Sequence, residues 1–199
     1  FRQKDRNTNE VYIGYSSPKT PSRVYLYNFS TKQKKLVKEQ LIPSGHNPDD
    51  YIVERVEFKS HDGRLVPLTI TRHKKTKIDG SANLLLYGYG SYGNSMSPSF
   101  SSTRLSLINR NIIWATAHIR GGMEKGMKWW KEGKLINKKN TFEDYIYAAK
   151  YLIEKKYTSK GKIIGMGGSA GGLLMGAVVN KAPDLFLGMI MAVPFVDSL

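Results

Sequence analysis

The chain has 199 residues, of which 40% are hydrophobic and 24% are charged, a balance typical of a globular protein. It contains no cysteine, which excludes disulfides and thiolate metal sites and fits a reducing compartment, so we expect a cytoplasmic location. No apolar run reaches the roughly 18 residues that a membrane-spanning helix needs, so no membrane partner is expected.

The formal net charge of +15 could indicate a nucleic-acid partner. The lysines, however, are scattered along the sequence rather than gathered in one basic helix with interleaved aromatic residues. Lysines on solvated faces explain such a pattern better. We therefore expect no nucleic acid among the partners.

The first forty residues indicate antiparallel strands. Residues 10–16 and 23–29 are rich in tyrosine and valine, a turn cluster separates them, and residues 35–38 could add a third strand. Such a set is typical of one blade of a β-propeller or of a free-standing β-meander. The loop at 43–48 follows, and we place a domain boundary in it, after residue 45.

Beyond that boundary the pattern predicts a hairpin and then an alternation of apolar strands and helices. The hairpin has strands at 51–59 and 64–71, with its turn at residues 61–63. The predicted strands that follow are 84–87, 112–117, 162–166 and 187–193, and the predicted helices are 100–109, 142–156 and 170–180. This order predicts an α/β fold with a mostly parallel, doubly wound sheet covered on both faces.

Residues 142–156 form the clearest of the predicted helices. Their apolar side chains recur at the i, i+3, i+4 and i+7 spacing of an amphipathic helix. Thr141 and Asp144 have the spacing of a variant capping box, so we predict that they start this helix.

The stretch GMGGSAGG at residues 165–172 surrounds one serine with glycines between a predicted strand and a predicted helix. Residues 165–170 match the dinucleotide fingerprint G-x-G-x-x-A. That fingerprint normally follows the first strand of its fold and needs an acidic residue at the end of the next strand. Here other strands come first, and Asp197 lies past the next strand. No lysine is present to make a nucleotide P-loop.

The same stretch satisfies the G-x-S-x-G pattern of a nucleophile elbow, in which Ser169 occupies a sharp turn from a buried strand to a helix. Glycines are needed two residues away on either side because strand and helix nearly touch there. The helix N-terminus would place the amide of Ala170 beside the reacting oxygen. The strand–turn–helix setting favours this interpretation.

Five segments of the chain carry a family likeness, which runs in order from about residue 12 to the end. They are Leu86-Tyr-Gly-Tyr-Gly-Ser-Tyr-Gly93, Ile119-Arg-Gly-Gly-Met-Glu124, Gly133-Lys-Leu-Ile-Asn-Lys-Lys-Asn-Thr-Phe-Glu-Asp144, Gly167-Gly-Ser-Ala-Gly-Gly172 and Val193-Pro-Phe-Val-Asp197. These segments resemble the prolyl oligopeptidase family of serine peptidases, and most closely its oligopeptidase B (protease II) branch.

The resemblance implies an α/β-hydrolase fold, incomplete at its C-terminal end and preceded by propeller strands. Residues 1–45 would be the last strands of an N-terminal β-propeller, and residues 46–199 the N-terminal two-thirds of the peptidase domain. Because the chain begins with Phe1 and ends directly after an apolar run, we expect a piece of a longer protein.

The resemblance also implies a serine-type oligopeptidase that cleaves short peptides after Arg or Lys. Ser169 would be the nucleophile, and the Ala170 amide and the Tyr89 hydroxyl would hold the oxyanion. Tyr92 would line the pocket for the side chain before the cut. The implied partners are short peptide substrates, and neither a metal nor an organic cofactor is implied.

A serine hydroxyl needs a general base, and in this fold the triad runs Ser, Asp, His along the chain. No histidine follows Ser169; the histidines are His46, His61, His73 and His118. His118 ends a predicted strand near the active-site edge, but we expect a structural role for it. Asp184 is expected to cap a helix end, and Asp197 belongs to a motif that precedes the catalytic aspartate in the family.

We therefore expect this chain to hold the nucleophile and the oxyanion hole without the base. Alone it would be inactive, and a further partner would be the missing C-terminal part of the same domain. Two alternatives remain open from the sequence: an esterase- or lipase-like hydrolase on the same sheet, and a non-catalytic remnant or basic binding module. Lipases usually carry a His-Gly-Gly-Gly oxyanion loop instead of the Tyr-Gly-Tyr-Gly seen here.

Overall fold

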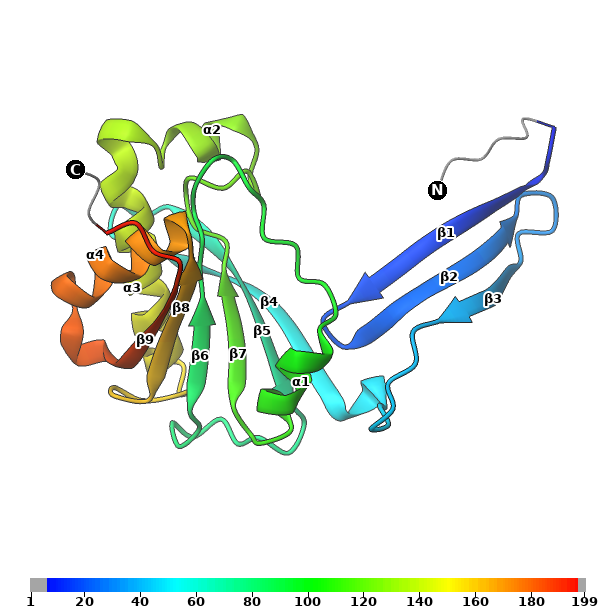
Figure 1. Ribbon diagram of the computed structural model, residues 1–199, viewed down its shortest axis with the longest axis horizontal. Coiled ribbons are helices and arrows are strands. Elements are labelled where there is room, and N and C mark those ends of the chain that lie inside the picture. The colour runs from blue at the N-terminus through cyan, green and yellow to red at the C-terminus, as the bar shows by residue number, and fades with distance from the viewer. Residues whose placement is uncertain (1–6, 197–199) are drawn as a thin grey trace.

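The computed structural model describes residues 7–196, and its larger sheet carries the C-terminal part of the chain (Figure 1). Within the described residues this sheet has the strand order β4-β5-β7-β6-β8-β9. The pairs β4–β5 and β5–β7 are antiparallel. The pairs β7–β6, β6–β8 and β8–β9 are parallel. The strands are β4 (Tyr51–Lys59), β5 (Leu65–His73), β6 (Leu84–Tyr87), β7 (Ile113–Ala117), β8 (Ile163–Gly168) and β9 (Phe186–Ala192).

Helices cover both faces of this sheet. Strand side chains alternate between the two faces, so Leu84 and Leu86 join the main core with α3 (Lys138–Glu154) and α4 (Ala170–Lys181). Trp114 of β7 points to the other face, where α1 (Ser102–Ile108) forms a smaller cluster. The remaining short segments are α2 (Met127–Lys131) and the 3₁₀ turns η1 (Pro48–Asp50), η2 (Leu135–Asn137) and η3 (Pro183–Leu185).

The predicted capping box at the start of the long helix is wrong. Helix α3 begins at Lys138, because η2 leads directly into it. Thr141 is therefore inside the helix, and its hydroxyl donates to the carbonyls of Arg120 and Gly133. Asp144 is fully buried and binds Arg120 rather than the helix's own backbone. Both side chains thus connect α3 to the loop after β7.

Helix α2 is an element that the sequence reasoning missed. It is only five residues long, between Gly126 and Gly133, so it is too short to show helical periodicity. Its Trp129 is buried, and the indole N–H donates to the carbonyl of His118. Trp130 remains half-exposed beside it. Trp129 therefore holds α2 against the residue that follows β7.

The N-terminal strands form an antiparallel ribbon that stands away from the rest of the molecule (Figure 1). It consists of β1 (Glu10–Ser17), β2 (Thr20–Asn28) and β3 (Lys34–Glu39). Its side chains join neither of the two hydrophobic clusters of the described residues. The ribbon leaves large apolar side chains exposed, namely Tyr12, Ile13, Tyr15, Leu36 and Val37. A ribbon of this kind needs further packing for stability.

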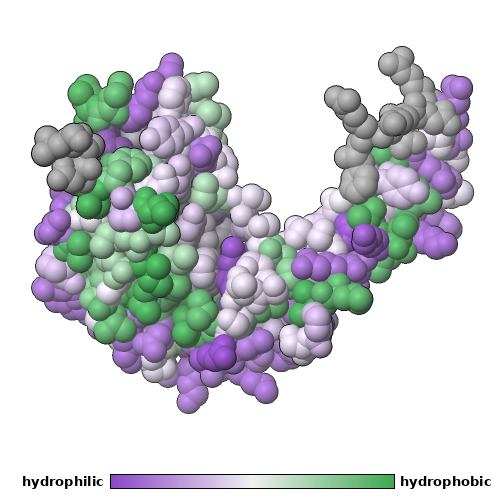
Figure 2. Space-filling view, in the orientation of Figure 1, coloured by the Kyte–Doolittle hydropathy of each residue, from purple (hydrophilic) through white to green (hydrophobic). Residues whose placement is uncertain are grey.

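Hydrophobic side chains also gather where β9 forms one edge of the larger sheet (Figure 2). The solvent-exposed fractions of Leu187, Ile190 and Met191 there are 63%, 44% and 41%. An apolar sheet edge left open in this way is a template for further strands. In the part of the chain that the structure covers, residues 7–196, we find no helix with the length and apolar character of a membrane span.

Candidate active site

Ser169 connects the end of β8 to the start of α4, at the carboxyl ends of the parallel strands. Its φ of 53° and ψ of −116° are strained for a residue with a side chain. Its amide donates to the carbonyl of Ala192 at 2.9 Å, and its carbonyl accepts from the amide of Gly172 at 2.8 Å. The residue is exposed. The turn therefore holds the backbone firmly while the hydroxyl faces solvent, as a nucleophile elbow requires.

The glycines of the elbow are explained by close backbone approach. A Cβ on Gly167 would lie 2.3 Å from the carbonyl oxygen of Gly171, which is closer than any side chain tolerates. The next position, Ala170, is 2% exposed and is the first residue of α4. A helix's first amides have no acceptor within the helix, so the Ala170 N–H is available at the site.

Tyr89 belongs to the loop that follows β6, which we call the tyrosine loop (residues 88–93). The ring is half-buried and lies against the first turn of α4, since a Cβ on Gly171 would be 3.4 Å from Tyr89 Cδ2. The structure thus brings Tyr89 to the same turn of α4 that carries Ser169 and Ala170. The residues predicted for the oxyanion hole come from two parallel strand ends that are neighbours in the sheet.

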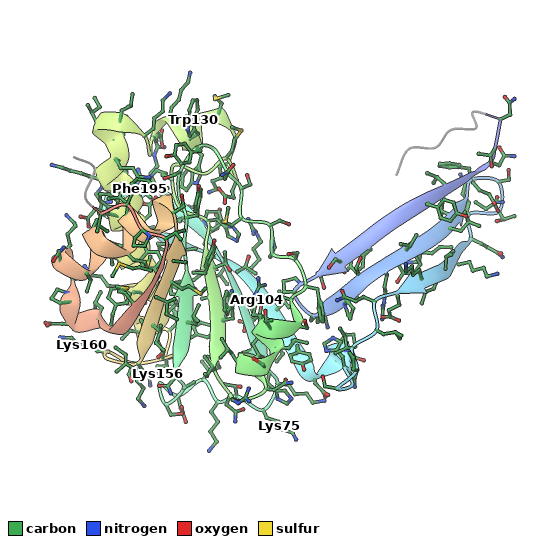
Figure 3. All side chains as sticks on the ribbon, viewed as in Figure 1. Lys75, Arg104, Trp130, Lys156, Lys160 and Phe195 are labelled. Carbon is green, nitrogen blue, oxygen red and sulfur yellow. The ribbon has the colours of Figure 1, made fainter. Side chains whose placement is uncertain are left out.

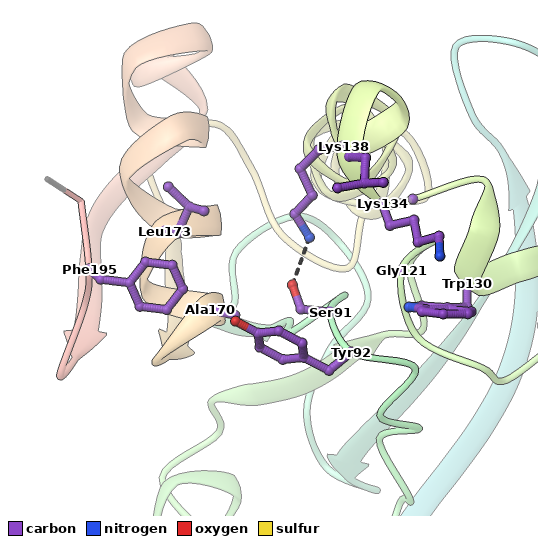
Figure 4. A pocket seen from close by; sticks show the side chains of 11 residues that line it. Ser91, Tyr92, Gly121, Trp130, Lys134, Lys138, Ala170, Leu173 and Phe195 are labelled. Carbon is purple, nitrogen blue, oxygen red and sulfur yellow. Dashed lines mark hydrogen bonds between the residues drawn. The ribbon is translucent and has the colours of Figure 1, made fainter. Parts of the chain in front are cut away.

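Tyr92 lies at the far end of the tyrosine loop, with a positive φ of 56° and 70% exposure. It lines a pocket of about 460 Å³ whose wall also includes Ala170. Figure 4 shows Leu173 and Phe195 on one side of this pocket and Trp130 and Lys134 on the other. Figure 3 shows Trp130 and Phe195 at this end of the sheet, far from Lys156 and Lys160 at the opposite end. The predicted pocket residue therefore lines a cavity beside the elbow.

Lys138, the first residue of α3, reaches into the wall of this pocket. Its ammonium donates to the carbonyl of Gly90 at 2.6 Å and to the hydroxyl of Ser91 at 2.7 Å. Figure 4 shows the bond to Ser91 as a dashed line. Burial lowers the pKa of Lys138 to about 8. Sequence reasoning missed this residue, because one lysine in a run of lysines and asparagines carries no signal of being partly buried.

A buried ion-pair network supports the loop after β7. Arg120 is 1% exposed and Asp144 is fully buried, and the guanidinium donates to the Asp144 carboxylate at 2.6 and 2.9 Å. Arg120 also binds Asp62, and Ser60 donates to Asp144 at 2.6 Å. Burial disfavours the guanidinium, but its hydrogen bonds to both carboxylates outweigh this and raise the pKa of Arg120. Sequence reasoning missed this network, because Asp144 lies off the predicted apolar face of the helix and has the spacing of a capping residue.

Gly121 continues this loop into contact with the tyrosine loop. It has a φ of 97°, and a Cβ there would lie 2.0 Å from the carbonyl oxygen of Gly90. Gly121→Ala is expected to combine backbone strain of about 1–2 kcal/mol with overpacking of about 1–3 kcal/mol. The free energy of unfolding in urea measures the loss.

Gly126→Ala is the matched control for this substitution. Its φ of 83° imposes similar strain, but a Cβ there meets nothing within 4 Å. We expect only the strain component in this variant, about 1–3 kcal/mol, because its φ of 83° and ψ of −170° lie in a region that only glycine adopts readily. Equal losses in the two variants would contradict the close approach of Gly121 to the tyrosine loop.

His118 directly follows β7 and makes its contacts with side chains of β4 and β5. The ring is 1% exposed, and Nε2 lies 2.8 Å from the Thr69 hydroxyl and 3.1 Å from Arg55 Nη1. Nδ1 lies 3.6 Å from Glu124. These contacts are the structural role expected for it.

The other histidines and the later aspartates make their contacts elsewhere. His46 packs on Tyr51, and Asp184 lies in η3, where it pairs with Lys160 at 3.3 Å instead of capping a helix. Asp197 lies outside the described residues. Among residues 7–196, no group of three or more His, Asp or Glu side chains could hold a metal ion.

The chain is similar to known peptidases over nearly its whole length. It is 44% identical over 194 residues to dipeptidyl aminopeptidase BI of Pseudoxanthomonas mexicana, covering 97% of this chain and 27% of that protein. The structure of oligopeptidase B from Leishmania major is 40% identical, with a TM-score of 0.88, over 97% of this chain and 27% of that one.

A third similar structure has a peptide in place. Prolyl oligopeptidase B from Galerina marginata, bound to a 35mer hydrolysis and macrocyclization substrate, is 35% identical. Its TM-score is 0.87, and the match covers 94% of this chain and 26% of that one. This relative therefore acts on peptides.

The chain thus spans about a quarter of the length of the relatives it matches. These likenesses confirm the expected fold: the N-terminal ribbon is part of a propeller blade, and the larger sheet is the beginning of an α/β-hydrolase fold. The sequence pattern described as "Prolyl oligopeptidase family" matches residues 98–199, just over half of the sequence. The chain belongs to the prolyl oligopeptidase family of serine peptidases.

Proposed function

We propose that the whole protein carrying this chain hydrolyses peptide bonds, with Ser169 as the nucleophile. The observation that carries the proposal is the exposed hydroxyl of Ser169 on a strained turn between β8 and α4. Relatives of this chain are serine peptidases by family, and one of them has been solved with a peptide substrate.

In the proposed reaction the Ser169 oxygen attacks the carbonyl carbon of the scissile bond while a base takes its proton. The carbonyl oxygen becomes an oxyanion, and the Ala170 N–H and the Tyr89 hydroxyl donate to it. Donors of this kind, fixed before the reaction, stabilise the tetrahedral intermediate because they need no reorganisation. The amine leaves with a proton from the base, and water then releases the acyl group from Ser169.

Short peptides cleaved after Arg or Lys are the proposed substrates, with Tyr92 against the side chain before the cut. The support for this preference is the resemblance to oligopeptidase B. The described wall of the pocket contributes Lys134 and Lys138 and no carboxylate. The acidic groups that bind a basic side chain would therefore come from the rest of the protein.

The resemblance to the family also supports a proposed domain organisation of the whole protein. Residues 1–45 would end a propeller domain, and residues 46–199 would begin the peptidase domain, whose Asp and His would lie further along the protein. The 199-residue chain alone would then be inactive, and its partner would be the remainder of its own domain. We propose a cytoplasmic location from the absence of cysteine.

Labelling with a fluorophosphonate tests the proposal. The whole protein is expected to react rapidly at Ser169, identified by mass spectrometry of the labelled peptide, and to hydrolyse an arginyl ester. The isolated 199-residue chain should react far more slowly, because an unactivated hydroxyl is a weak nucleophile. Labelling of the whole protein at another serine would contradict the assignment. Rapid turnover by the isolated chain would contradict the missing base.

A further inference from the structure

The tyrosine loop is held at both of its ends by backbone hydrogen bonds. The amide of Gly88 donates to the carbonyl of Met166 at 3.1 Å, and the amide of Gly93 donates to the carbonyl of Gly121 at 2.9 Å. Tyr89 lies between Gly88 and Gly90, and a glycine on each side allows the backbone a wide range of angles. The two end anchors alone therefore leave the direction of the Tyr89 side chain loosely determined.

Lys138 anchors the middle of the loop from a different element. It is the first residue of α3, and its ammonium binds the Gly90 carbonyl and the Ser91 hydroxyl at 2.6 and 2.7 Å. Gly90 also packs closely against α3, since a Cβ on Gly90 would lie 2.4 Å from Cγ2 of Thr141 in that helix. Helix α3 therefore fixes the residue next to Tyr89 by both a charge-assisted pair of bonds and close packing.

The surroundings of Lys138 keep its ammonium with these two acceptors and partly out of solvent. The ammonium is partly buried, and Ser91 is only 8% exposed. Burial lowers the pKa of Lys138 to about 8, because it disfavours the charged ammonium. The two hydrogen bonds offset part of the free energy that this desolvation costs. A lysine needed only for solubility would keep its ammonium in water, as the exposed Lys139 next to it does.

We propose that Lys138 is a positioning residue for the oxyanion hole, which holds the tyrosine loop so that the Tyr89 hydroxyl points at the reacting carbonyl oxygen. This inference rests on the proposed function, because it assigns Lys138 an effect only through Tyr89. A misplacement of about 1 Å at a catalytic group can cost about 100-fold in rate. Loss of the Lys138 anchor should therefore slow the acyl-transfer step while leaving substrate affinity nearly unchanged.

A double-mutant cycle in the whole protein tests this coupling. The variants are Lys138→Met, which keeps the length of the side chain without its donors, Tyr89→Phe, and the two together. The readouts are the rate constant of fluorophosphonate labelling, kcat and KM for an arginyl ester, and the thermal unfolding midpoint. Lys139→Met is the matched control, because it removes the neighbouring exposed lysine.

We expect Lys138→Met to slow labelling and lower kcat by about 10- to 100-fold, with KM changed by less than about threefold. In the Tyr89→Phe background the same substitution should cost less than about threefold, because the group it positions is gone. Lys139→Met should label at the wild-type rate. Ser91→Ala, which removes one of the two acceptors and keeps the lysine, should lie between wild type and Lys138→Met.

The possible failures are distinguishable. A wild-type protein that does not label, or a Tyr89→Phe variant that labels at the wild-type rate, contradicts the proposed function itself. If wild type labels and Tyr89→Phe is slow, but Lys138→Met costs the same factor in both backgrounds, the positioning role is overturned and Lys138 is structural. A large rise in KM with kcat unchanged would overturn it as well and make Lys138 a substrate contact. If Lys138→Met fails to fold, an unchanged rate in Ser91→Ala overturns the proposal.

Discussion

Replacing Ser169 by alanine in the whole protein is expected to lower kcat for an arginyl ester by about a million-fold, the scale seen when a triad serine is removed. Stability should not fall with it. The Ser169 side chain makes no capping hydrogen bond to α4, and it is exposed. Substitutions at such positions usually change the free energy of unfolding by less than about 0.5 kcal/mol. Steady-state kinetics and thermal unfolding of the same preparation separate the two effects.

Ser169→Gly is a control whose stability, compared with that of Ser169→Ala, measures the backbone strain of the turn. Alanine keeps the unfavourable φ of 53°, whereas glycine adopts it freely. Relief of the strain should outweigh the entropy that glycine loses on folding, so Ser169→Gly should be more stable than Ser169→Ala by about 1 kcal/mol. Equal stabilities would mean that the elbow is not strained, and substantial turnover by Ser169→Ala would remove Ser169 from the reaction.

Breaking the buried pair between Arg120 and Asp144 is expected to have the largest effect on folding. In Asp144→Ala the guanidinium stays buried, and its remaining carboxylate partner is the more exposed Asp62. Removing one member of a buried pair typically costs about 3–5 kcal/mol, because it leaves an uncompensated charge. Ser60 and the backbone amide of Arg120 would also lose their acceptor. Urea unfolding monitored by tryptophan fluorescence measures the loss.

Glu143→Ala is the matched control, since Glu143 is the neighbouring carboxylate on the same helix. It pairs with Lys181 at 2.8 Å near the surface, where the Lys181 side chain is 43% exposed. Surface pairs of this kind contribute about 0–1 kcal/mol. A loss in Asp144→Ala no larger than that in Glu143→Ala would show that the Arg120 network does not hold the loop after β7.

Local patterns in the sequence were sufficient where each element depends on its own residues. The predicted strands at 51–59 and 84–87 match β4 and β6 residue for residue, because alternating or continuous apolar runs reflect burial directly. The sharp turn at Ser169 could be predicted in the same way, because the close approach of strand and helix requires glycine within a few residues. These requirements are met by neighbours along the chain.

The same reasoning failed where a polar residue serves a distant part of the chain. Thr141 and Asp144 have the spacing of a capping box, yet they bind Arg120, which lies more than 20 positions earlier. Lys138 looked like one more solvated lysine, and its acceptors in the tyrosine loop are 47 and 48 positions away. Side-chain chemistry alone does not distinguish a local partner from a remote one.

The sequence by itself determined the alternation of strands and helices, the position of the sharp turn at Ser169 and the family to which the chain belongs. Only the tertiary structure decided that β6 lies between β7 and β8, which brings the tyrosine loop against the first turn of α4. It also decided that α3 carries Lys138 and Asp144 to the neighbouring loops. The physical reason is that backbone geometry and apolar periodicity are short-range properties, whereas a hydrogen bond or an ion pair depends on which strand ends the folded sheet places side by side.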